Sequence, residues 1–249
     1  MNDLLHLEGL RRSFGDFLAI DDLNLVLPAG RLTSIIGPNG AGKTTLINLV
    51  TGLLSPDRGR VLLEGCDITR LSADQRVRRG LGRSFQVSTV FSQMTVADNL
   101  RLPVLARRNP AAVPLRRLEG DAAVEAEVDG LLDAFDIQEL REQQAGSLAH
   151  GSQRFVELAM AVASRPRLCF LDEPCAGLNP SERERLLQLI SRLKADTTFI
   201  VVEHDMDVVF AISEWIIVLN RGAVLAEGPP DRIRADAAVR ETYLGGLAS

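Results

Sequence analysis

Hydrophobic and polar residues alternate near the start of the chain in two runs, LLHLEGL and FLAIDDLNLVL, and Pro28, Ala29 and Gly30 form a turn signal after them. Alternation with a period of two is typical of half-buried strands, so we expect two or three strands to pair here. The pattern then predicts a short apolar strand over residues 32–36, a glycine-rich loop, and a helix in TTLINLVTGLL that ends near Pro56. Strand, loop and helix in this order predict half of an α/β unit.

The middle of the chain has a different pattern. The segment SADQRVRRG opens with a capping-box signature, Ser72 to Gln75, and Gly80 can end the short helix. Residues 96–143 lack strand signals, and AVEAEVDGLLDAFDIQEL has apolar residues at helical spacing. We therefore expect a mostly helical subdomain over about residues 88–165.

After this insert, strands and helices alternate again, in the order RLCFLDE, SERERLLQLISRL, TTFIVVEH, DMDVVFAI, EWIIVLN and AVLAEG. This order predicts an α/β fold in which one sheet is interrupted by the helical subdomain. We expect a single domain over residues 1–249, with residues 1–87 and 166–249 forming its core.

Composition narrows the class of protein. The 249 residues, 46% hydrophobic and 24% charged, can bury a substantial core. Apolar runs such as LCFL and WIIVL fall far short of the roughly eighteen residues that a membrane-spanning helix needs. The first residues, MNDLLHLEGLRRSFGD, carry charges where a secretory signal is apolar, so we expect a cytoplasmic protein. The net charge of −5 argues against a general nucleic-acid binder, because phosphate neutralisation needs a basic face.

The cysteines are Cys66, Cys169 and Cys175. Their number is odd and no CxxC spacing occurs, so the sequence supports neither a disulfide framework nor a zinc site. We expect all of them to be buried structural thiols.

The glycine-rich loop matches G-x-x-x-x-G-K-[ST] between a predicted strand and a predicted helix, the context that gives this pattern meaning. Backbone N–H groups of such a loop point toward one anion, Lys43 can reach the β- and γ-phosphates, and the Thr44 hydroxyl can bind Mg²⁺. The alternative is a glycine-rich turn with an exposed lysine. The candidate phosphate-binding residues are Gly37, Pro38, Asn39, Gly40, Ala41, Gly42, Lys43, Thr44 and Thr45.

An acidic pair, Asp172 and Glu173, follows the apolar strand in RLCFLDEP. At the carboxyl end of a parallel strand these side chains would lie beside the phosphate loop, where Asp172 can hold Mg²⁺ through water and Glu173 can polarise the attacking water. Gln86 ends GLGRSFQ and His204 ends FIVVEH, so both would reach the γ-phosphate region if those strands neighbour the loop. Taken alone, the acidic pair could equally be surface residues at the end of a strand. His204 alone could equally be a surface histidine after a strand.

With these motifs in order, the chain resembles the nucleotide-binding subunit of ATP-binding cassette (ABC) transporters over essentially its whole length. The resemblance rests on GPNGAGKTT, Gln86, LAHGSQR, CFLDEP, AGLNP and His204. It implies a P-loop NTPase fold with a mixed sheet core, an antiparallel β subdomain and a helical subdomain. It also implies that ATP and Mg²⁺ bind, with Glu173, His204 and Gln86 catalytic and Thr44, Gln86 and Asp172 at the metal.

The same resemblance implies that two subunits close head to tail over the nucleotides. The segment LAHGSQR would supply an anion-binding helix start from across the interface, through His150, Gly151, Ser152 and Gln153. This segment departs from the usual LSGGQ, so which side chain replaces the serine contact stays open. Phe14 takes the place of the ring that stacks on adenine, although a lone Phe is more often a core residue.

Longer strings, RSFQ with TVFSQMTVADNL and the ending YLG, resemble ATPase subunits of branched-chain amino acid importers. Urea and short-amide importers and the lipopolysaccharide exporter are similar. The resemblance implies two transmembrane permease subunits, a second ATPase subunit, an indirect substrate-binding protein, and a peripheral place on the cytoplasmic face of the inner (plasma) membrane.

Two other classes compete with transport: a soluble ABC-type ATPase of translation or repair, and a small-molecule kinase. Near Gln86, a group of arginines would either receive a helix of a membrane partner or form a solvated basic face. The group consists of Arg76, Arg78, Arg79 and Arg83.

Overall fold

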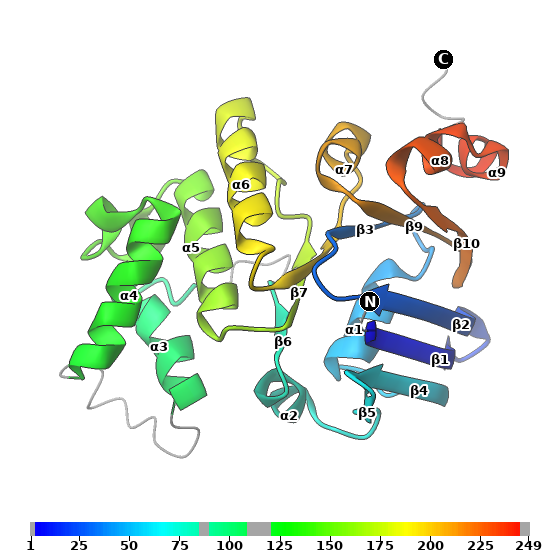
Figure 1. Ribbon diagram of the computed structural model, residues 1–249, viewed down its shortest axis with the longest axis horizontal. Helices are drawn as coiled ribbons and strands as arrows, with labels where there is room; N and C mark the ends of the chain where they lie inside the picture. Colours follow the sequence, from blue (N-terminus) through cyan, green and yellow to red (C-terminus); the bar gives the residue numbers. More distant parts are fainter. Residues whose placement is uncertain (1–2, 85–89, 109–120, 245–249) are drawn as a thin grey trace.

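A six-stranded mixed sheet forms the centre of the molecule, with strand order β10-β9-β3-β8-β7-β6 (Figure 1). The structure, a computed structural model, describes residues 3–84, 90–108 and 121–244. The strands are β3 (Thr33–Ile36), β6 (Leu81–Arg83), β7 (Leu168–Asp172), β8 (Thr198–Val202), β9 (Trp215–Asn220) and β10 (Ala223–Gly228). All neighbours pair in parallel except β9 and β10, which are antiparallel. The expected α/β fold class is confirmed.

A second sheet, entirely antiparallel, has strand order β2-β1-β4-β5. It consists of β1 (Asp3–Phe14), β2 (Phe17–Pro28), β4 (Arg58–Leu63) and β5 (Cys66–Asp67), and in Figure 1 it lies on the side of α1 away from the helices α3 to α5. The expected antiparallel β part is confirmed, including the pairing of the two N-terminal runs. The two strands that the sequence pattern left out, β4 and β5, are joined by Glu64 and Gly65, which both have positive φ, as a tight two-residue hairpin requires.

The thiols do not share one environment. Cys66 begins the two-residue edge strand β5 directly after the hairpin turn, and its side chain is exposed. Cys169 and Cys175 are buried. The expectation of three buried thiols is therefore wrong for Cys66, because the short edge strand β5 leaves its side chain open to solvent.

Arg76 joins helix α2 (Ala73–Arg78) to the end of helix α1 (Lys43–Thr51). Its buried guanidinium donates to Leu49 O at 2.6 Å and Val50 O at 2.7 Å, carbonyls in the last turn of α1. It thereby satisfies groups that a helix leaves without intrahelical partners. The expected capping box of Ser72 and Gln75 is present at the start of α2. Arg76 is thus no part of a solvated basic face, whereas Arg78 and Arg79 are exposed.

Helices α3 (Val96–Arg108), α4 (Ala122–Phe135) and α5 (His150–Ala163) stand at one end of the molecule, with the short turns η2 (Gln138–Leu140) and η3 (Ala145–Ser147) between the last two. They fall within the segment expected to be helical. Whether residues 88–165 act as a subdomain of their own stays a prediction.

The remaining helices alternate with or follow the strands of the central sheet. They are α6 (Pro180–Leu193), α7 (Met206–Ile212), α8 (Pro230–Ala235), α9 (Ala237–Val239) and η4 (Arg240–Leu244). Asn179 and Glu182 form a capping box at the start of α6, where Pro180 takes the first helical position. A sharp strand-to-helix connection therefore follows β7.

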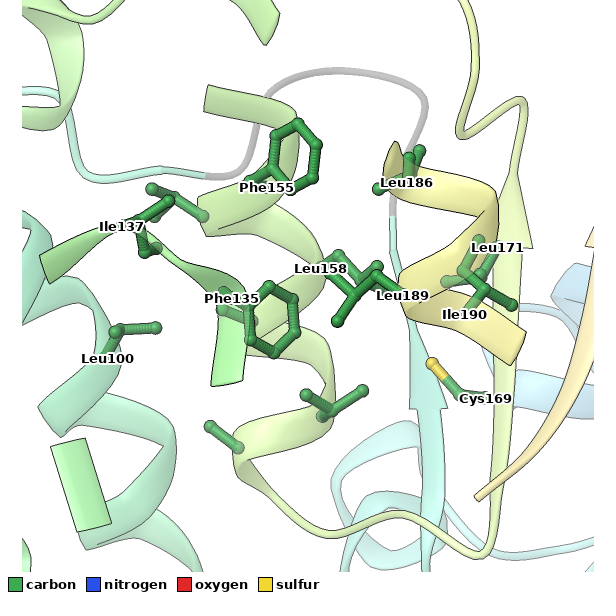
Figure 2. Close-up of a cluster of buried hydrophobic side chains, with 14 of the residues drawn as sticks. Leu100, Phe135, Ile137, Phe155, Leu158, Cys169, Leu171, Leu186, Leu189 and Ile190 are labelled. Carbon is green, nitrogen blue, oxygen red and sulfur yellow. The ribbon is translucent and has the colours of Figure 1, made fainter. Parts of the chain in front are cut away.

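Side chains of β7 alternate between two cores on opposite faces of the sheet. Leu168 and Phe170 pack with α1, and Cys169 and Leu171 pack with α5 and α6. Figure 2 shows the second core, where Phe135 and Phe155 of the helical end approach Leu189 of α6 and the sheet. This core is continuous from the helices to the sheet and fixes the position of α5.

Candidate functional site

The phosphate loop connects β3 to α1, in the predicted strand–loop–helix context. Gly42 caps α1 with φ of 102°, and a Cβ there would lie 2.6 Å from the Ala19 carbonyl oxygen. Only glycine satisfies both conditions. Lys43 begins α1, and its ammonium folds back over the loop, donating to Gly37 O at 2.6 Å and Pro38 O at 3.1 Å. The loop is therefore closed around its own lysine, with the Thr44 side chain exposed beside it.

The acidic pair lies at the carboxyl edge of the same sheet, although β8 separates β7 from β3. Burial lowers the pKa of Lys43, and the charges of Glu173 and Asp172 oppose that shift. Lys43 and both carboxylates thus belong to one electrostatic site. Burial also raises the pKa of Asp172, and the Arg83 guanidinium opposes this rise at an N–O distance of 3.4 Å. Asp172 is the buried acid and Glu173 the half-buried one.

Glu173 and His204, both expected to be catalytic, lie within contact distance. Glu173 Oε1 is 3.5 Å from His204 Nδ1. Glu173 has φ of 49°, a left-handed conformation that non-glycine residues rarely adopt, and its N–H donates to Val202 O at 2.8 Å. The strained turn directs the Glu173 side chain toward His204, the second residue after β8. Strain of this kind is concentrated at functional sites.

Gln86, expected at the metal and in catalysis, lies outside the described residues. The strand that leads to it, β6, is present next to β7 and ends at Arg83. The structure thus places Lys43, Asp172, Glu173 and His204 in one site.

The segment LAHGSQR behaves as expected of a helix start: Ala149 caps α5, and His150 is its first residue. Its contacts are with its own chain: the loop that follows β7, the start of α6 and the turn before α5. His150 Nε2 lies 3.3 Å from Ala176 O, and a Cβ on Gly151 would lie 2.2 Å from a Glu182 carboxylate oxygen. Gln153 donates its amide to two backbone carbonyls of its own chain, at 3.2 Å each. The Gln153 side chain therefore holds the turn before α5.

Phe14 lies at the end of β1, opposite Phe17, and is 45% exposed. The Arg12 guanidinium stacks on one face of its ring at 4.9 Å. The side chain is thus not a core residue, which removes the structural alternative considered for it. Its contact with adenine stays a prediction.

The sequence analysis did not predict a role at this site for three polar residues, Asn48, Arg83 and Glu203. Asn48 of α1 accepts from Arg83 Nη1 at 2.6 Å, so Arg83 bridges the phosphate-loop helix to Asp172. Arg83 is therefore not on an exposed basic face. Glu203 is 2% exposed and accepts from the Cys175 N–H at 3.0 Å. The one signal for Glu203 was a charge directly after an apolar strand.

The side chains at the site suit magnesium only together with a phosphate ligand. Within the described ranges no three His, Cys, Asp or Glu side chains gather as a protein-only metal site. The Thr44 hydroxyl and the Asp172 carboxylate are oxygen donors of the kind that Mg²⁺ uses when substrate phosphates complete its shell. The residues present therefore fit a nucleotide-bound Mg²⁺.

Comparison with known proteins agrees with this geometry. The sequence model of the family described as "ABC transporter" matches residues 20–176, which contain the phosphate loop, the LAHGSQR segment and the acidic pair. The chain belongs to the ABC transporter family. Residues 223–248 of this ABC protein match a second model, described as "Branched-chain amino acid ATP-binding cassette transporter". The expected resemblance and the expected ATPase class are confirmed.

Relatives of this ABC protein match over nearly the whole chain. It is 38% identical over 251 residues to the high-affinity branched-chain amino acid transport ATP-binding protein BraF of Pseudomonas aeruginosa, covering 97% of this chain and 98% of BraF. It is 38% identical over 254 residues to the corresponding LivG of Escherichia coli, covering 97% of this chain and 98% of LivG. It is 36% identical over 246 residues to the lipopolysaccharide export system ATP-binding protein LptB of Acidithiobacillus ferridurans, covering 98% of each.

Solved structures agree in fold. A nucleotide-free ATP-binding cassette from an ABC transporter has a TM-score of 0.85 at 32% identity, covering 97% of this chain and 98% of that chain. An ABC transporter cassette in its ADP conformation has a TM-score of 0.87 at 32% identity, covering 98% and 100%. Nucleotide-bound and nucleotide-free cassettes therefore share this architecture.

Proposed function

We propose that this ABC protein is the ATP-hydrolysing subunit of a membrane importer for branched-chain amino acids or related small amides such as urea. The observation that carries the proposal is the Glu173–His204 pair, 3.5 Å apart at the edge where Lys43 and Asp172 also lie. The names of the BraF and LivG relatives and the matched C-terminal family model support the cargo class.

The triphosphate of ATP would lie on the phosphate loop. Its oxygens would accept from the backbone N–H groups around Gly40 and Gly42, from the start of α1 and from Lys43, which would exchange its two carbonyl partners for phosphate. Thr44 and Asp172 would hold Mg²⁺, with Gln86 as a further ligand; the ion neutralises charge on the transferred phosphoryl group. Phe14 would stack on the adenine.

Glu173 would act as general base. Its carboxylate would accept a proton from the attacking water, while His204 contacts the γ-phosphate and fixes the direction of attack. No covalent intermediate on the protein is needed, because positioning and electrostatic stabilisation account for most catalysis of phosphoryl transfer. Hydrolysis would therefore depend on how well the strained turn at Glu173 is held.

A second ATPase subunit would complete each site. The start of α5, with backbone N–H groups near Gly151, would bind the γ-phosphate held by the partner's phosphate loop. The side chains of Gln153 and His150 already contact backbone carbonyls of their own chain, so Ser152 is the favoured side-chain donor. Closing and opening of the pair would drive the transport cycle.

The proposed partners are two transmembrane permease subunits and, indirectly, a substrate-binding protein, with this subunit peripheral on the cytoplasmic face of the inner (plasma) membrane. Among the residues that the structure covers, no helix is long and apolar enough to cross a bilayer. Purification from membranes tests these partners. Recovery with two permease proteins is expected, and recovery as a free protein that phosphorylates a metabolite would overturn the proposal.

The catalytic assignment is tested with Glu173→Gln. We expect retained ATP binding and loss of turnover, because the amide keeps the shape of the side chain but cannot take the proton. Glu184→Gln, at an exposed position of α6, is the matched control and should turn over normally. Full turnover by Glu173→Gln would refute the role of Glu173 as base.

A second candidate is an exporter ATPase of the lipopolysaccharide type, favoured by the 36% identity to LptB. The membrane proteins recovered with the subunit distinguish the two. Permeases with a soluble amino-acid-binding protein support import, and a lipid-exporting partner set supports the second candidate.

A further inference from the structure

Three contacts tie residues 173–183, which follow β7, to residues 202–205 at the end of β8, on both sides of His204. The Glu173 N–H donates to Val202 O at 2.8 Å, and the Cys175 N–H donates to Glu203 Oε1 at 3.0 Å. Farther along, Arg183 Nη1 lies 2.9 Å from Asp205 Oδ2. The residues immediately before and after His204 are therefore both anchored to the segment that begins with Glu173.

Glu203 is the unusual member of this set, because it is an acidic side chain with only 2% of its surface exposed. It directly follows Val201 and Val202, which are buried in the apolar cores. Burial of a carboxylate is unfavourable unless hydrogen bonds compensate, and an apolar residue would fill the same space without this penalty. Packing alone therefore does not account for an acid at this position.

The bond from Cys175 falls two residues after the strained backbone of Glu173. A left-handed conformation of a non-glycine residue costs roughly 1–3 kcal/mol and persists only where its surroundings enforce it. Glu173 is held on its N-terminal side by its own N–H bond to Val202 O, and Glu203 holds the chain on the C-terminal side. With Glu203 removed, the turn can relax from one end.

We propose that Glu203 is a positioning residue for ATP hydrolysis: its carboxylate holds the Cys175 backbone and thereby keeps the Glu173 side chain against His204. This inference rests on the proposed function, since it assumes that Glu173 and His204 act on ATP. Glu203 acts through the backbone and does not itself reach the nucleotide. Misplacement of a catalytic group by about 1 Å can cost on the order of a hundredfold in rate.

The same tether reaches the segment LAHGSQR. Cys175 is followed by Ala176, whose carbonyl oxygen lies 3.3 Å from His150 Nε2, and by Gly177, where a Cβ would lie 2.8 Å from the same nitrogen. The backbone that Glu203 holds is thus the surface on which the imidazole of His150 rests. Loosening it would disturb the hydrolytic pair and the start of α5 together.

The test compares Glu203→Ala, Glu203→Leu and Glu203→Gln in the full chain, purified with the membrane subunits that accompany it. Ala removes the acceptor, Leu removes it while filling the space, and Gln keeps an acceptor oxygen. We expect kcat to fall about ten- to a hundredfold in the Ala and Leu variants, with KM for ATP changed less than about threefold. Gln should retain at least about a third of kcat.

Asp236→Ala is the matched control, because it also removes a carboxylate that accepts a backbone N–H, from Val239 at 3.1 Å, in α9. It should leave kcat unchanged. A structural role of Glu203 alone would lower the melting temperature without this split between kcat and KM, or would leave Gln as inactive as Ala.

A lower melting temperature without the split between kcat and KM would overturn the proposal, as would a Gln variant as inactive as the Ala variant. So would near-normal kcat in Glu203→Leu, or failure of both the Ala and Leu variants to fold. Glu173→Gln separates the two hypotheses. If Glu173→Gln is inactive and Glu203→Leu is normal, only the role of Glu203 fails. If Glu173→Gln turns over, the proposed function of the site fails.

Discussion

Arg83 and Asp172 form a buried ion pair, with Nη2 of the guanidinium 3.4 Å from Oδ2 of the carboxylate. Arg83 also donates to Asn48 of α1 at 2.6 Å, so one side chain links the phosphate-loop helix, β6 and β7. Asp172 is 5% exposed. The acid proposed to hold Mg²⁺ is thus oriented by a residue of the strand that leads to Gln86.

Replacement of Arg83 by Ala is expected to destabilise the fold by about 3 kcal/mol, because loss of one partner leaves a buried charge without this counter-ion. Urea unfolding of the nucleotide-free protein measures the change. Adding Asp172→Asn should recover part of the loss, since the buried charge is then gone. Strict additivity of the two changes, within about 0.5 kcal/mol, would show that the pair is not coupled.

Gly42 and Gly40 provide a second prediction, because both have positive φ but differ in surroundings. A Cβ on Gly42 would lie 2.6 Å from Ala19 O, whereas one on Gly40 would have no neighbour within 4 Å among the residues that the structure describes. Gly42→Ala should therefore displace the loop and abolish ATP binding. Gly40→Ala should cost only the strain of its backbone, roughly 1 kcal/mol.

Fluorescent ATP-analogue binding and thermal unfolding measure these effects side by side. Equal losses of binding in the two variants would mean that backbone strain alone, and not the approach of Ala19, makes glycine necessary at Gly42.

The local sequence predicted most of the strands and helices, and the strand–loop–helix arrangement of the phosphate loop, because these depend on short-range patterns. Strands around Phe170 and Ile200 follow from continuous apolar runs, and the loop ending in Lys43 follows from its glycine spacing. The order of strands does not follow from such patterns: β3 lies between β8 and β9, which are far from it in sequence. We expected the acidic pair to lie beside the loop. Both do lie at the carboxyl edge of one sheet, but strand β8, whose place the sequence did not predict, separates β7 from β3.

The arginines show that the burial of a charged side chain cannot be predicted from the local sequence. Arg76 and Arg78 are two residues apart in RVR, yet Arg76 is 1% exposed and Arg78 is exposed. What separates them is the position of the last turn of α1, whose carbonyls receive Arg76. Burial of a charged side chain depends on partners distant in sequence, so composition and spacing could not distinguish the two. The same holds for Glu203 and Cys175, which are 28 residues apart.

The buried thiols predict a pH dependence of stability. Burial raises the pKa of Cys169 from 9.0 to about 12, and burial with the nearby Glu203 charge raises the pKa of Cys175 to about 12. In the unfolded chain these thiols ionise near their ordinary pKa, while in the folded chain they stay protonated. Their contribution is therefore fully present below about pH 8.5 and is lost progressively as the pH rises toward about 12.

Urea unfolding at about pH 8 and about pH 10 should show this loss of free energy. Cys169→Ala should lower stability at both pH values by leaving a cavity, and should make the difference between them smaller. Cys66→Ala, at the exposed thiol, is the control and should leave the difference unchanged. An unchanged pH difference in Cys169→Ala would contradict the raised pKa. In the native protein, a thiol reagent should modify Cys66 before the other two.

The exposed rings at the end of the N-terminal hairpin test the adenine contact. Phe14 and Phe17 pair across β1 and β2 and are 45% and 58% exposed, so loss of either should cost little stability. If Phe14 stacks on adenine, Phe14→Ala should weaken ATP binding by about 1–2 kcal/mol, which is roughly five- to thirtyfold, and Phe14→Tyr should restore it. Phe17→Ala serves as the neighbouring control and should bind ATP normally. Equal ATP affinity in the Phe14→Ala and Phe17→Ala variants would exclude Phe14 from the nucleotide site.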